Sequence, residues 1–402
     1  MALTPGYRQT EIGVIPESWA VQLLGTLATT VASGRSSAGR AAGLYSVYGS
    51  TGVIGYATTP DYEGNAILVA RVGANAGKLN LVSGKYGVTD NTIILRLNDS
   101  HCLLFFWQQL EIKRLNSLVY GSGQPLITGT MLKALSVAVP SFPEQIAIAT
   151  ALSEADALTE ALEQLVAKKR HIKQGAMQEF LTGKKRLPGF QIKPGYKQTE
   201  VGVIPEDWDT PSLGELLTRV ANGLVYKSGK TTRYPVTRIE TIADSSINLD
   251  RVGYAEPTAD IEKYRVQPGD ILFSHINSVD HIGKVAIYRG GDALYHGMNL
   301  LLLRAESRVN SNYLHLWLGS AGARKKAATL AKRAVSQASI NTGELRAVLV
   351  PLPPTLAEQT AIATVLSDMD TEIDALETKL TKTRQIKQGM MHNLLTGRIR
   401  LI

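Results

Sequence analysis

The sequence predicts an α+β protein in which two mixed α/β domains are separated by two long helices. The helices are expected to form an antiparallel intramolecular coiled coil, so that the fold is a pseudo-twofold repeat. Residues 5–19 return at 194–208 with 12 of 15 positions identical. Longer matches recur 214 positions apart, at residues 144–153 with 358–367 and at residues 172–183 with 386–397. Collinear matches of this quality indicate an internal duplication, which constrains the architecture before any local element is assigned.

Each half is expected to contain a substantial sheet. Short apolar runs bounded by turn residues predict strands at 65–71 and 92–97, and again at 270–274 and 299–303. Between the repeated segments the halves diverge, and the second is 25 residues longer. One framework therefore carries two different domains. The predicted boundaries are 1–143 for the first domain, 144–187 for the first helix, 188–355 for a linker and the second domain, and 356–402 for the second helix.

The two helical segments are rich in Ala, Leu, Glu, Lys and Gln and lack proline over residues 144–181 and 357–395. Apolar residues at alternating steps of three and four form a heptad seam in each segment. The predicted seam residues are Leu152, Leu162, Val166, Leu366, Met369, Ile373, Leu376 and Leu380, and the first stripe is widened by Leu158, Leu165 and Ile172. Two such stripes can bury each other, which favours a coiled coil. The alternative is that each helix packs only on its own domain.

Composition places the chain among ordinary globular proteins, with 44% hydrophobic and 19% charged residues. No apolar run approaches the roughly 18 residues that a membrane span needs, so we expect a cytoplasmic location. The single cysteine, Cys102, excludes an internal disulfide framework and a cysteine-rich zinc site. The net charge of +8 suggests a polyanionic partner, although many basic proteins bind no nucleic acid.

A second resemblance between the halves lies inside the divergent domains. Residues 66–78 and 270–284 both read as a strand that leads into a polar loop ending in Gly-Lys. Loops of this composition suit an approach to DNA, because Arg, Lys and Asn bond base edges and phosphates. The alternative is an ordinary β-turn. The candidate DNA contacts are Arg35, Arg40, Tyr48, Ser50, Arg71, Asn75, Lys78 and Asn91 in the first domain, and Lys227, Lys230, Arg233, His275, Asn277, His281 and Lys284 in the second.

Catalytic interpretations find little support. The Gly-Lys segment ending at Lys78 is one residue short of a phosphate loop, and the segment from Gly223 to Thr231 is one residue too long. No histidine lies in a zinc-binding arrangement.

The basic clusters at 168–171 and 184–186 are either DNA-facing or solvated helix surface.

Four sequence features resemble specificity subunits of type I restriction-modification systems. They are the repeated Gly-Tyr-Arg/Lys-Gln-Thr-Glu segment at 6–11 and 195–200, the Glu-Gln-x-Ala-Ile-Ala helix starts, the Ile-Lys-Gln-Gly to Leu-Thr-Gly helix ends, and residues 48–52. The resemblance covers essentially the whole chain. It implies two target recognition domains, each reading half of a bipartite asymmetric DNA site, and helices that set the spacer between the halves.

The same resemblance implies a subunit without an active site or cofactor of its own. Its partners would be double-stranded DNA, two adenine methyltransferase subunits and the restriction/translocase subunits, with S-adenosylmethionine, ATP and Mg on those partners. Three alternatives remain open. They are an endonuclease acting alone, a repeat-built scaffold that does not bind DNA, and a degenerate specificity subunit that only blocks a host enzyme.

Overall fold

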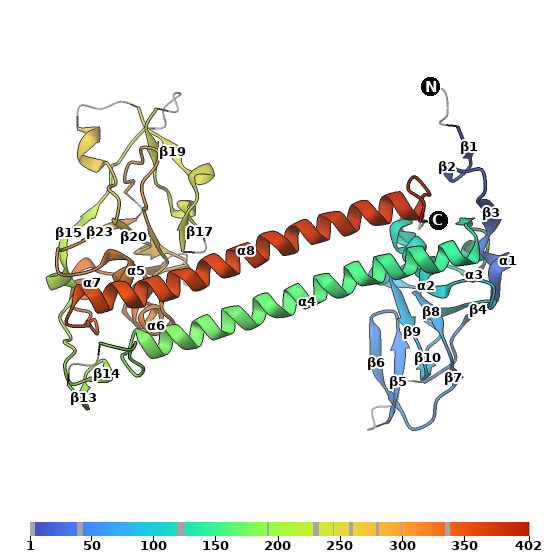
Figure 1. Ribbon diagram of the computed structural model, residues 1–402, viewed down its shortest axis with the longest axis horizontal. Coiled ribbons are helices and arrows are strands. Elements are labelled where there is room, and N and C mark those ends of the chain that lie inside the picture. Colours follow the sequence, from blue (N-terminus) through green and yellow to red (C-terminus); the bar gives the residue numbers. More distant parts are fainter. Residues whose placement is uncertain are drawn as a thin grey trace. The chain divides into compact units, whose positions relative to one another are not determined.

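A computed structural model of the protein describes residues 5–37, 43–118, 125–190, 193–227, 233–243, 245–256, 260–278, 281–298, 300–333 and 338–401. The chain forms two compact units (Figure 1): unit 1 comprises residues 1–164 and 377–402, and unit 2 comprises residues 165–376. Two long helices, α4 (Phe142–Phe180) and α8 (Leu356–Leu395), each contribute a part to both units. Among the described helices, none is both long enough and apolar enough to cross a bilayer.

Both units contain the repeated segment, and in each it folds as a hairpin. In unit 1, β1 (Tyr7–Thr10) pairs with β2 (Gly13–Pro16); in unit 2, β13 (Tyr196–Thr199) pairs with β14 (Gly202–Pro205). The hydroxyl of Thr10 donates to the carbonyl of Gly13, and that of Thr199 to Gly202, each at 2.7 Å. Both glycines, the first residues after the two-residue turns, have φ near +110°, a conformation that favours glycine.

Unit 1 is built on two four-stranded sheets. The first has the order β4-β11-β8-β9 and is antiparallel throughout, whereas the second, β6-β5-β10-β7, contains the parallel pair β5/β10. A separate ladder joins β3 (Ala20–Leu23) to β12 (Ser136–Val139). The remaining elements are α1 (Leu24–Leu27), β4 (Ala28–Ser33), β5 (Tyr45–Gly49), β6 (Gly52–Ala57), β7 (Tyr62–Glu63), β8 (Ala66–Ala70), β9 (Leu79–Val82), β10 (Lys85–Val88), β11 (Thr92–Leu97), α2 (Leu103–Ile112) and α3 (Gly129–Lys133).

Unit 2 repeats the first of these sheets with the order β15-β23-β20-β22, so the strands correspond one to one. The strands predicted at 65–71, 92–97, 270–274 and 299–303 are confirmed as β8, β11, β20 and β23. The elements are β15 (Leu217–Asn222), β16 (Pro235–Val236), β17 (Ile242–Ala243), β18 (Ser246–Ile247), β19 (Gly253–Tyr254), β20 (Ile271–Phe273), β21 (Ile276–Asn277), β22 (Val285–Ile287), β23 (Leu301–Ala305), α5 (Ser311–Gly319), α6 (Ala321–Leu330), β24 (Lys332–Arg333), β25 (Ala338–Ser339) and α7 (Thr342–Arg346).

A corresponding helix follows the matched strands in each unit, α2 in unit 1 and α5 in unit 2. The amide of Cys102, before α2, donates to the side chain of Gln145 at 2.8 Å. The amide of Asn310, before α5, donates to Gln359 at the same distance. Since Gln145 and Gln359 are 214 positions apart in the repeat, Cys102 and Asn310 occupy equivalent positions. The two halves therefore share one fold, as the sequence predicts.

In each unit, parts of α4 and α8 pack antiparallel. Unit 1 contains the ion pairs Asp156–Lys387 and Glu163–Arg384, the second at 2.6 Å. Unit 2 contains Asp370–Lys173 and Glu372–Lys169, the latter also at 2.6 Å. Within each unit, the residue number of the α8 partner falls as the residue number along α4 rises, which confirms antiparallel packing. Asp156–Lys387 and Asp370–Lys173 are the same pair repeated 214 positions apart.

The seam residues differ in burial. Leu162 and Val166 of α4 and Ile373 and Leu380 of α8 are buried, whereas Met369 and Leu376 are half-buried. Leu152 and Leu366 are fully buried within the hydrophobic cores of unit 1 and unit 2, respectively. Leu158, Leu165 and Ile172, which were expected to widen the first stripe, are not buried in the seam, because they remain 38–47% exposed.

A tryptophan, a glutamate and an arginine join the repeated segment to both long helices in each unit. In unit 1, Trp19 donates to Glu144 at 3.0 Å, and Arg400 bonds the same carboxylate while its guanidinium lies 5.7 Å from the Trp19 ring. In unit 2, Arg186 bonds Glu358 at 2.6 Å and lies 5.6 Å from the Trp208 ring. Each cluster therefore ties the repeated segment to the start of one long helix and to the residues that follow the other.

Candidate nucleic-acid interface

Predicted contact residues of unit 1 gather at one end of the β4-β11-β8-β9 sheet. Arg35 follows β4, Arg71 follows β8 directly and Asn91 precedes β11 directly. Since β11 is antiparallel to both neighbours, these three positions lie at the same end. Arg71 is anchored there, because its amide donates to the carbonyl of Asn91 at 2.9 Å and its guanidinium to the hydroxyl of Ser33 at 3.4 Å. Arg35 and Asn91 are exposed, so an arginine and an amide face solvent beside the anchored arginine.

The connection from β8 to β9 brings Asn75 and Lys78 to this end. The amide of Ala70 donates to the carbonyl of Lys78 at 2.9 Å, and the amide of Gly77 returns a bond to Ala70 at 2.8 Å. Gly77 has φ +90°, and a Cβ there would lie 2.6 Å from the amide nitrogen of Asn116. Only glycine fits this position. The loop is therefore held firmly while the Lys78 side chain is exposed and that of Asn75 is half-buried.

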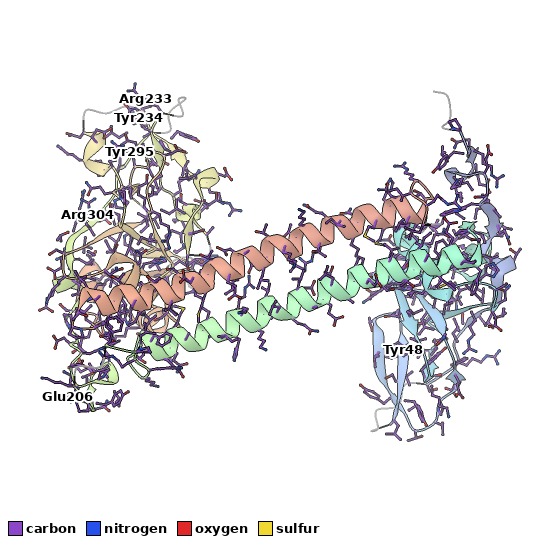
Figure 2. All side chains as sticks on the ribbon, in the orientation of Figure 1. Tyr48, Glu206, Arg233, Tyr234, Tyr295 and Arg304 are labelled. Atoms are coloured by element: carbon purple, nitrogen blue, oxygen red, sulfur yellow. The ribbon has the colours of Figure 1, made fainter. Side chains whose placement is uncertain are left out.

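Tyr48 reaches the same region from the second sheet. Its carbonyl accepts a hydrogen bond from the amide of Thr89 at 2.9 Å, two residues before Asn91. The Tyr48 ring (Figure 2) meets Tyr86 edge-on at 6.2 Å and is half-buried, so one part of it faces solvent. Ser50 lies in the turn between β5 and β6 and is also half-buried. Arg40 lies outside the described residues.

Unit 2 contains the same loop with different side chains. The amide of Ser274 donates to the carbonyl of Lys284, and the amide of Gly283 returns a bond to Ser274, both at 2.8 Å. Ser274, Gly283 and Lys284 therefore replace Ala70, Gly77 and Lys78. Within the loop, the Asn277 amide group donates to the Ser274 hydroxyl at 3.1 Å, and His281 is exposed. The two units thus present different polar groups from one backbone arrangement.

His275 is placed differently from the rest of the predicted set. Its side chain is buried, and burial lowers the pKa of its imidazole. The nearby His296 is also buried, which lowers its pKa to about 4, and its Nε2 lies 2.8 Å from the carbonyl of Leu300. Both rings are therefore neutral at pH 7 and add no positive charge to the surface. The position of His275 supports packing rather than contact with a ligand.

The other candidates in unit 2 lie away from this loop. Arg233 is exposed, and its guanidinium lies 5.4 Å from the Tyr234 ring (Figure 2). Lys227 is exposed in the segment before the β16 strand, and its carbonyl accepts from the amide of Glu256 at 3.3 Å. Lys230 lies outside the described residues. Unit 2 therefore offers two separate groups of candidates, one on the β20–β22 connection and one near β16 and β19.

Some cations of the predicted basic clusters form ion pairs within the protein and are therefore not available to contact DNA. Arg186 is held by Glu358 and Asp207 and is largely buried, so it neither lies on a solvated helix face nor faces DNA. Lys169 pairs with Glu372 of α8. Conversely, sequence reasoning missed the exposed run Arg324-Lys325-Lys326 on α6. Its match in the first half is short, Lys113-Arg114, so the repeat gave only a weak signal for it.

The described residues contain no group of three or more His, Cys, Asp or Glu side chains that is arranged to hold a metal ion. The arrangement instead provides arginine, lysine, asparagine and tyrosine side chains at the ends of two related sheets. Such groups bond phosphates and base edges. This chemistry is that of recognition.

The comparisons with known proteins agree with this chemistry. Residues 17–174 and 205–388 match the type I restriction modification DNA specificity domain. The putative type I restriction enzyme MjaX specificity subunit of Methanocaldococcus jannaschii is 46% identical over 212 residues, which are 52% of this chain and 50% of that protein. The MjaVIII specificity subunit of the same organism is 26% identical over 352 residues, 84% of this chain and 80% of that protein.

A solved structure has the same fold. The crystal structure of the type I restriction-modification S subunit from M. genitalium superposes with a TM-score of 0.61 at 16% identity, covering 98% of this chain and 99% of the other.

Proposed function

This chain belongs to the family of type I restriction-modification DNA specificity subunits, and on that basis we propose that it binds a bipartite, asymmetric DNA site with one half-site per unit. One observation carries the proposal. The loops ending at Lys78 and Lys284 share their backbone hydrogen bonds but carry different side chains. A shared framework with different side chains suits two half-sites of different sequence, because base contacts specify sequence whereas phosphate contacts only position the protein.

Within each proposed interface, roles follow from chemistry. Arg71 and Asn91 in unit 1, and Asn277 in unit 2, are suited to base edges, since arginine bonds guanine and asparagine bonds adenine in pairs of hydrogen bonds. Lys78, Lys284 and Ser50 are suited to phosphates. The anchoring of Arg71 by Ser33 limits the side-chain freedom that binding would otherwise remove.

We further propose that α4 and α8 set the length of the spacer between the half-sites. Each is a single helix of about 40 residues that contributes to both units. At about 1.5 Å per residue, such a helix changes length in small, regular steps.

The proposed partners are double-stranded DNA, two adenine methyltransferase subunits and the restriction/translocase subunits. S-adenosylmethionine, ATP and Mg would be bound by those partners, and this chain would contribute recognition without a cofactor. The exposed apolar side chains Leu158, Leu165 and Ile172 on α4, and Ile386 on α8, are candidate docking points for the methyltransferases. Leu158, Leu165 and Ile172 recur every seven residues and therefore share one face of α4, and contiguous exposed apolar surface marks interaction sites.

Co-expression with a matching methyltransferase subunit tests the proposal. Single-molecule sequencing of the host genome should then reveal a new bipartite methyladenine motif. Replacing residues 20–140 should alter one half of the motif, and replacing residues 209–350 the other half. A stable complex that methylates nothing would favour a blocking role. A chain without salt-dependent affinity for DNA would favour a scaffold.

A further inference from the structure

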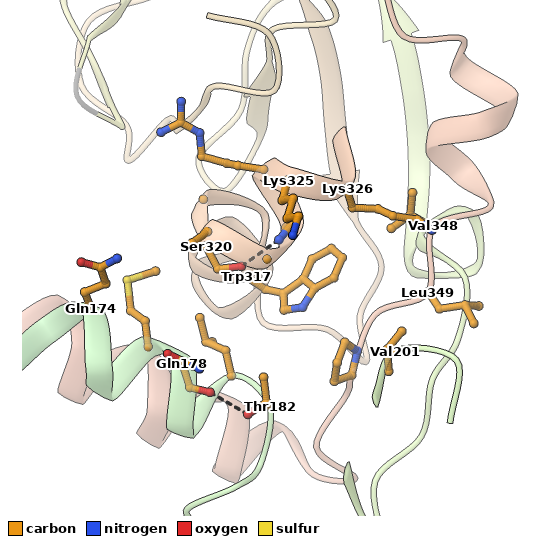
Figure 3. Close-up of a pocket in the computed structure, with 18 of the residues that line it drawn as sticks. Gln174, Gln178, Thr182, Val201, Trp317, Ser320, Lys325, Lys326, Val348 and Leu349 are labelled. Atoms are coloured by element: carbon orange, nitrogen blue, oxygen red, sulfur yellow. Dashed lines mark hydrogen bonds between the residues drawn. The ribbon is translucent and has the colours of Figure 1, made fainter. Parts of the chain in front are cut away.

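Unit 2 contains a groove of about 900 Å³ that the DNA-recognition role does not use. One wall is the end of α4 and the turn that follows it, with Gln174, Gln178 and Thr182 (Figure 3). The opposite wall is the junction of α5 and α6, with Trp317 and Ser320. A groove of this size can take the side chains of a helical or extended peptide segment.

The chemistry of the groove is amphipathic and strongly basic. Its floor is apolar: Leu181, Trp317 and Val348 belong to the core of unit 2 and are at most 9% exposed, and Met177 packs half-buried beside them. Its cations are Arg170, Lys173, Lys184, Arg324, Lys325 and Lys326, whereas Glu200 is the single acidic residue among the lining residues that the structure describes. Lys173 is paired with Asp370, but Arg324, Lys325 and Lys326 are exposed and make no ion pair within the described ranges.

All lining residues of the groove belong to unit 2, and the equivalent part of unit 1 differs from it at one wall. The α4 wall is repeated in unit 1, where Lys387 and Met391 of α8 stand for Lys173 and Met177. The other wall is repeated only in part. Lys113 and Arg114 precede a short 3-10 turn (Leu115–Leu118) at the place of Lys325 and Lys326 on α6, whereas Ile112 stands at the place of Arg324. Counting from the equivalent residues Cys102 and Asn310, Glu111 of unit 1 corresponds to Gly319 of unit 2. Burial raises the pKa of Glu111, and the positive charge of the nearby Lys387 opposes that rise.

Unit 1 thus has a carboxylate where unit 2 has only glycine. A Cβ added at Gly319 would meet only the Val285 side chain, at an ordinary 3.6 Å. The absence of a side chain at Gly319 therefore leaves space and places no carboxylate beside the cations of α6. In addition, α6 and its basic residues lie in the longer second half and line the groove of unit 2.

We infer that this groove binds an acidic, amphipathic segment of a methyltransferase subunit, an inference that rests on the proposed function. The charge of the groove fits acidic side chains, and its apolar surface fits the hydrophobic face of the same segment. Duplex DNA fits less well, because a convex phosphate surface gains nothing from Met177, Leu181 or Trp317. A small ligand also fits less well, because the polar side chains that line the groove are half-buried or exposed rather than fixed in the interior.

A consequence is that the two methyltransferase copies are held unequally. The copy on unit 2 would gain contacts that unit 1 cannot provide, since Glu111 would repel an acidic segment at the corresponding place. Native mass spectrometry across a methyltransferase titration should then show two copies bound in two steps of different affinity.

Gly319→Glu is the decisive variant, because it introduces the residue that unit 1 carries. Gly319→Ala is its matched control, since it changes the backbone equally but adds neither charge nor length. We expect Gly319→Glu to weaken the tighter step by about tenfold at physiological salt, and Gly319→Ala to leave it unchanged. The exposed double reversal Lys325→Glu/Lys326→Glu should have the same effect, with Lys133→Glu/Lys193→Glu as a control of equal charge change outside the groove.

The outcomes separate this inference from the proposed function. Full retention of both binding steps by Gly319→Glu and by the double reversal would overturn the groove assignment. Loss of DNA affinity by the free chain, with methyltransferase binding intact, would show instead that the groove holds phosphates. Failure of the wild-type chain to bind any methyltransferase while it still binds DNA would reject the proposed docking role itself. Circular dichroism of each variant checks that it remains folded.

Discussion

Replacing Arg186 by methionine should destabilise unit 2 strongly. The guanidinium bonds Glu358 at 2.6 Å and Asp207 at 2.8 Å, and the side chains of these carboxylates are only 1% and 5% exposed. Methionine keeps much of the side-chain volume but leaves both carboxylates without this cation. Removing one partner of a buried ion pair costs about 3–5 kcal/mol. For a unit of this size that corresponds to a fall in melting temperature of roughly 6–20 °C.

The loss should depend on pH in a defined direction. Burial raises the pKa of Glu358, and the hydrogen bonds and charge of Arg186 oppose that rise. A carboxyl whose pKa is higher in the folded state stabilises the fold below its unfolded pKa, about 4.3, and loses that contribution as pH rises through the folded pKa. Arg186→Met removes the opposing cation, so the pKa of Glu358 should rise further. The deficit of the variant should therefore be larger at pH 7 than at pH 5.

Urea unfolding at both pH values measures this effect, and hydrogen exchange of peptides that contain Trp208 locates it in unit 2. The double variant Arg186→Met/Glu358→Gln should regain part of the loss, because it removes one uncompensated charge. Arg400→Met is the matched change in unit 1, where the arginine is 29% exposed and bonds one glutamate. Its cost should be about 3 kcal/mol or less. A free energy of unfolding for Arg186→Met within about 0.5 kcal/mol of wild type would refute the reasoning.

Three further predictions concern recognition and packing. Arg71→Ala should cost about 1–3 kcal/mol of specific DNA affinity and relax one half-site; an equal loss for specific and random DNA, measured by fluorescence anisotropy, would contradict a base contact. Duplication of residues 159–162 within α4 should lengthen that helix by about 6 Å, or about two base pairs of DNA, and lengthen the methylated spacer accordingly. Methylation at the original spacing would show that the helix does not set it. Gly183→Ala should destabilise unit 2 by at least about 1–2 kcal/mol in urea, because Gly183 has φ +70° and a Cβ would lie 2.4 Å from Pro205. A variant as stable as wild type would mean that the Pro205 contact is not tight in solution.

The framework was predictable because its residues recur. The hairpin segments, the helix starts and the helix ends repeat at fixed spacings, and α4 and α8 begin within two residues of the predicted positions. The role of Arg186 was not predictable from its neighbours, since Lys184 and Lys185 make it look like part of a basic surface. The recurrence of arginine at 186 and 400, beside repeated Trp and Glu residues, is a signal that was available in the sequence.

The candidate interface was predictable only in part. The alignment of the two Gly-Lys segments correctly indicated a shared loop, because that loop depends on local backbone bonds and on a glycine. The burial of His275 was not predictable, since it depends on packing against segments far away in sequence. The α6 groove was not predictable, because only the fold brings Trp317, Gly319 and the end of α4 together.

The construction of unit 1 from two distant segments sets the order in which the protein can fold during synthesis. Unit 2 is continuous, because residues 165–376 contain all of its segments. Unit 1 must wait for residues 377–400, which supply Arg400 and the second helix. At about 5–20 residues per second, the ribosome needs roughly 10–40 s to bridge that interval. During this time Leu162 lacks its partner helix, so the half that is made first is the half that is completed last.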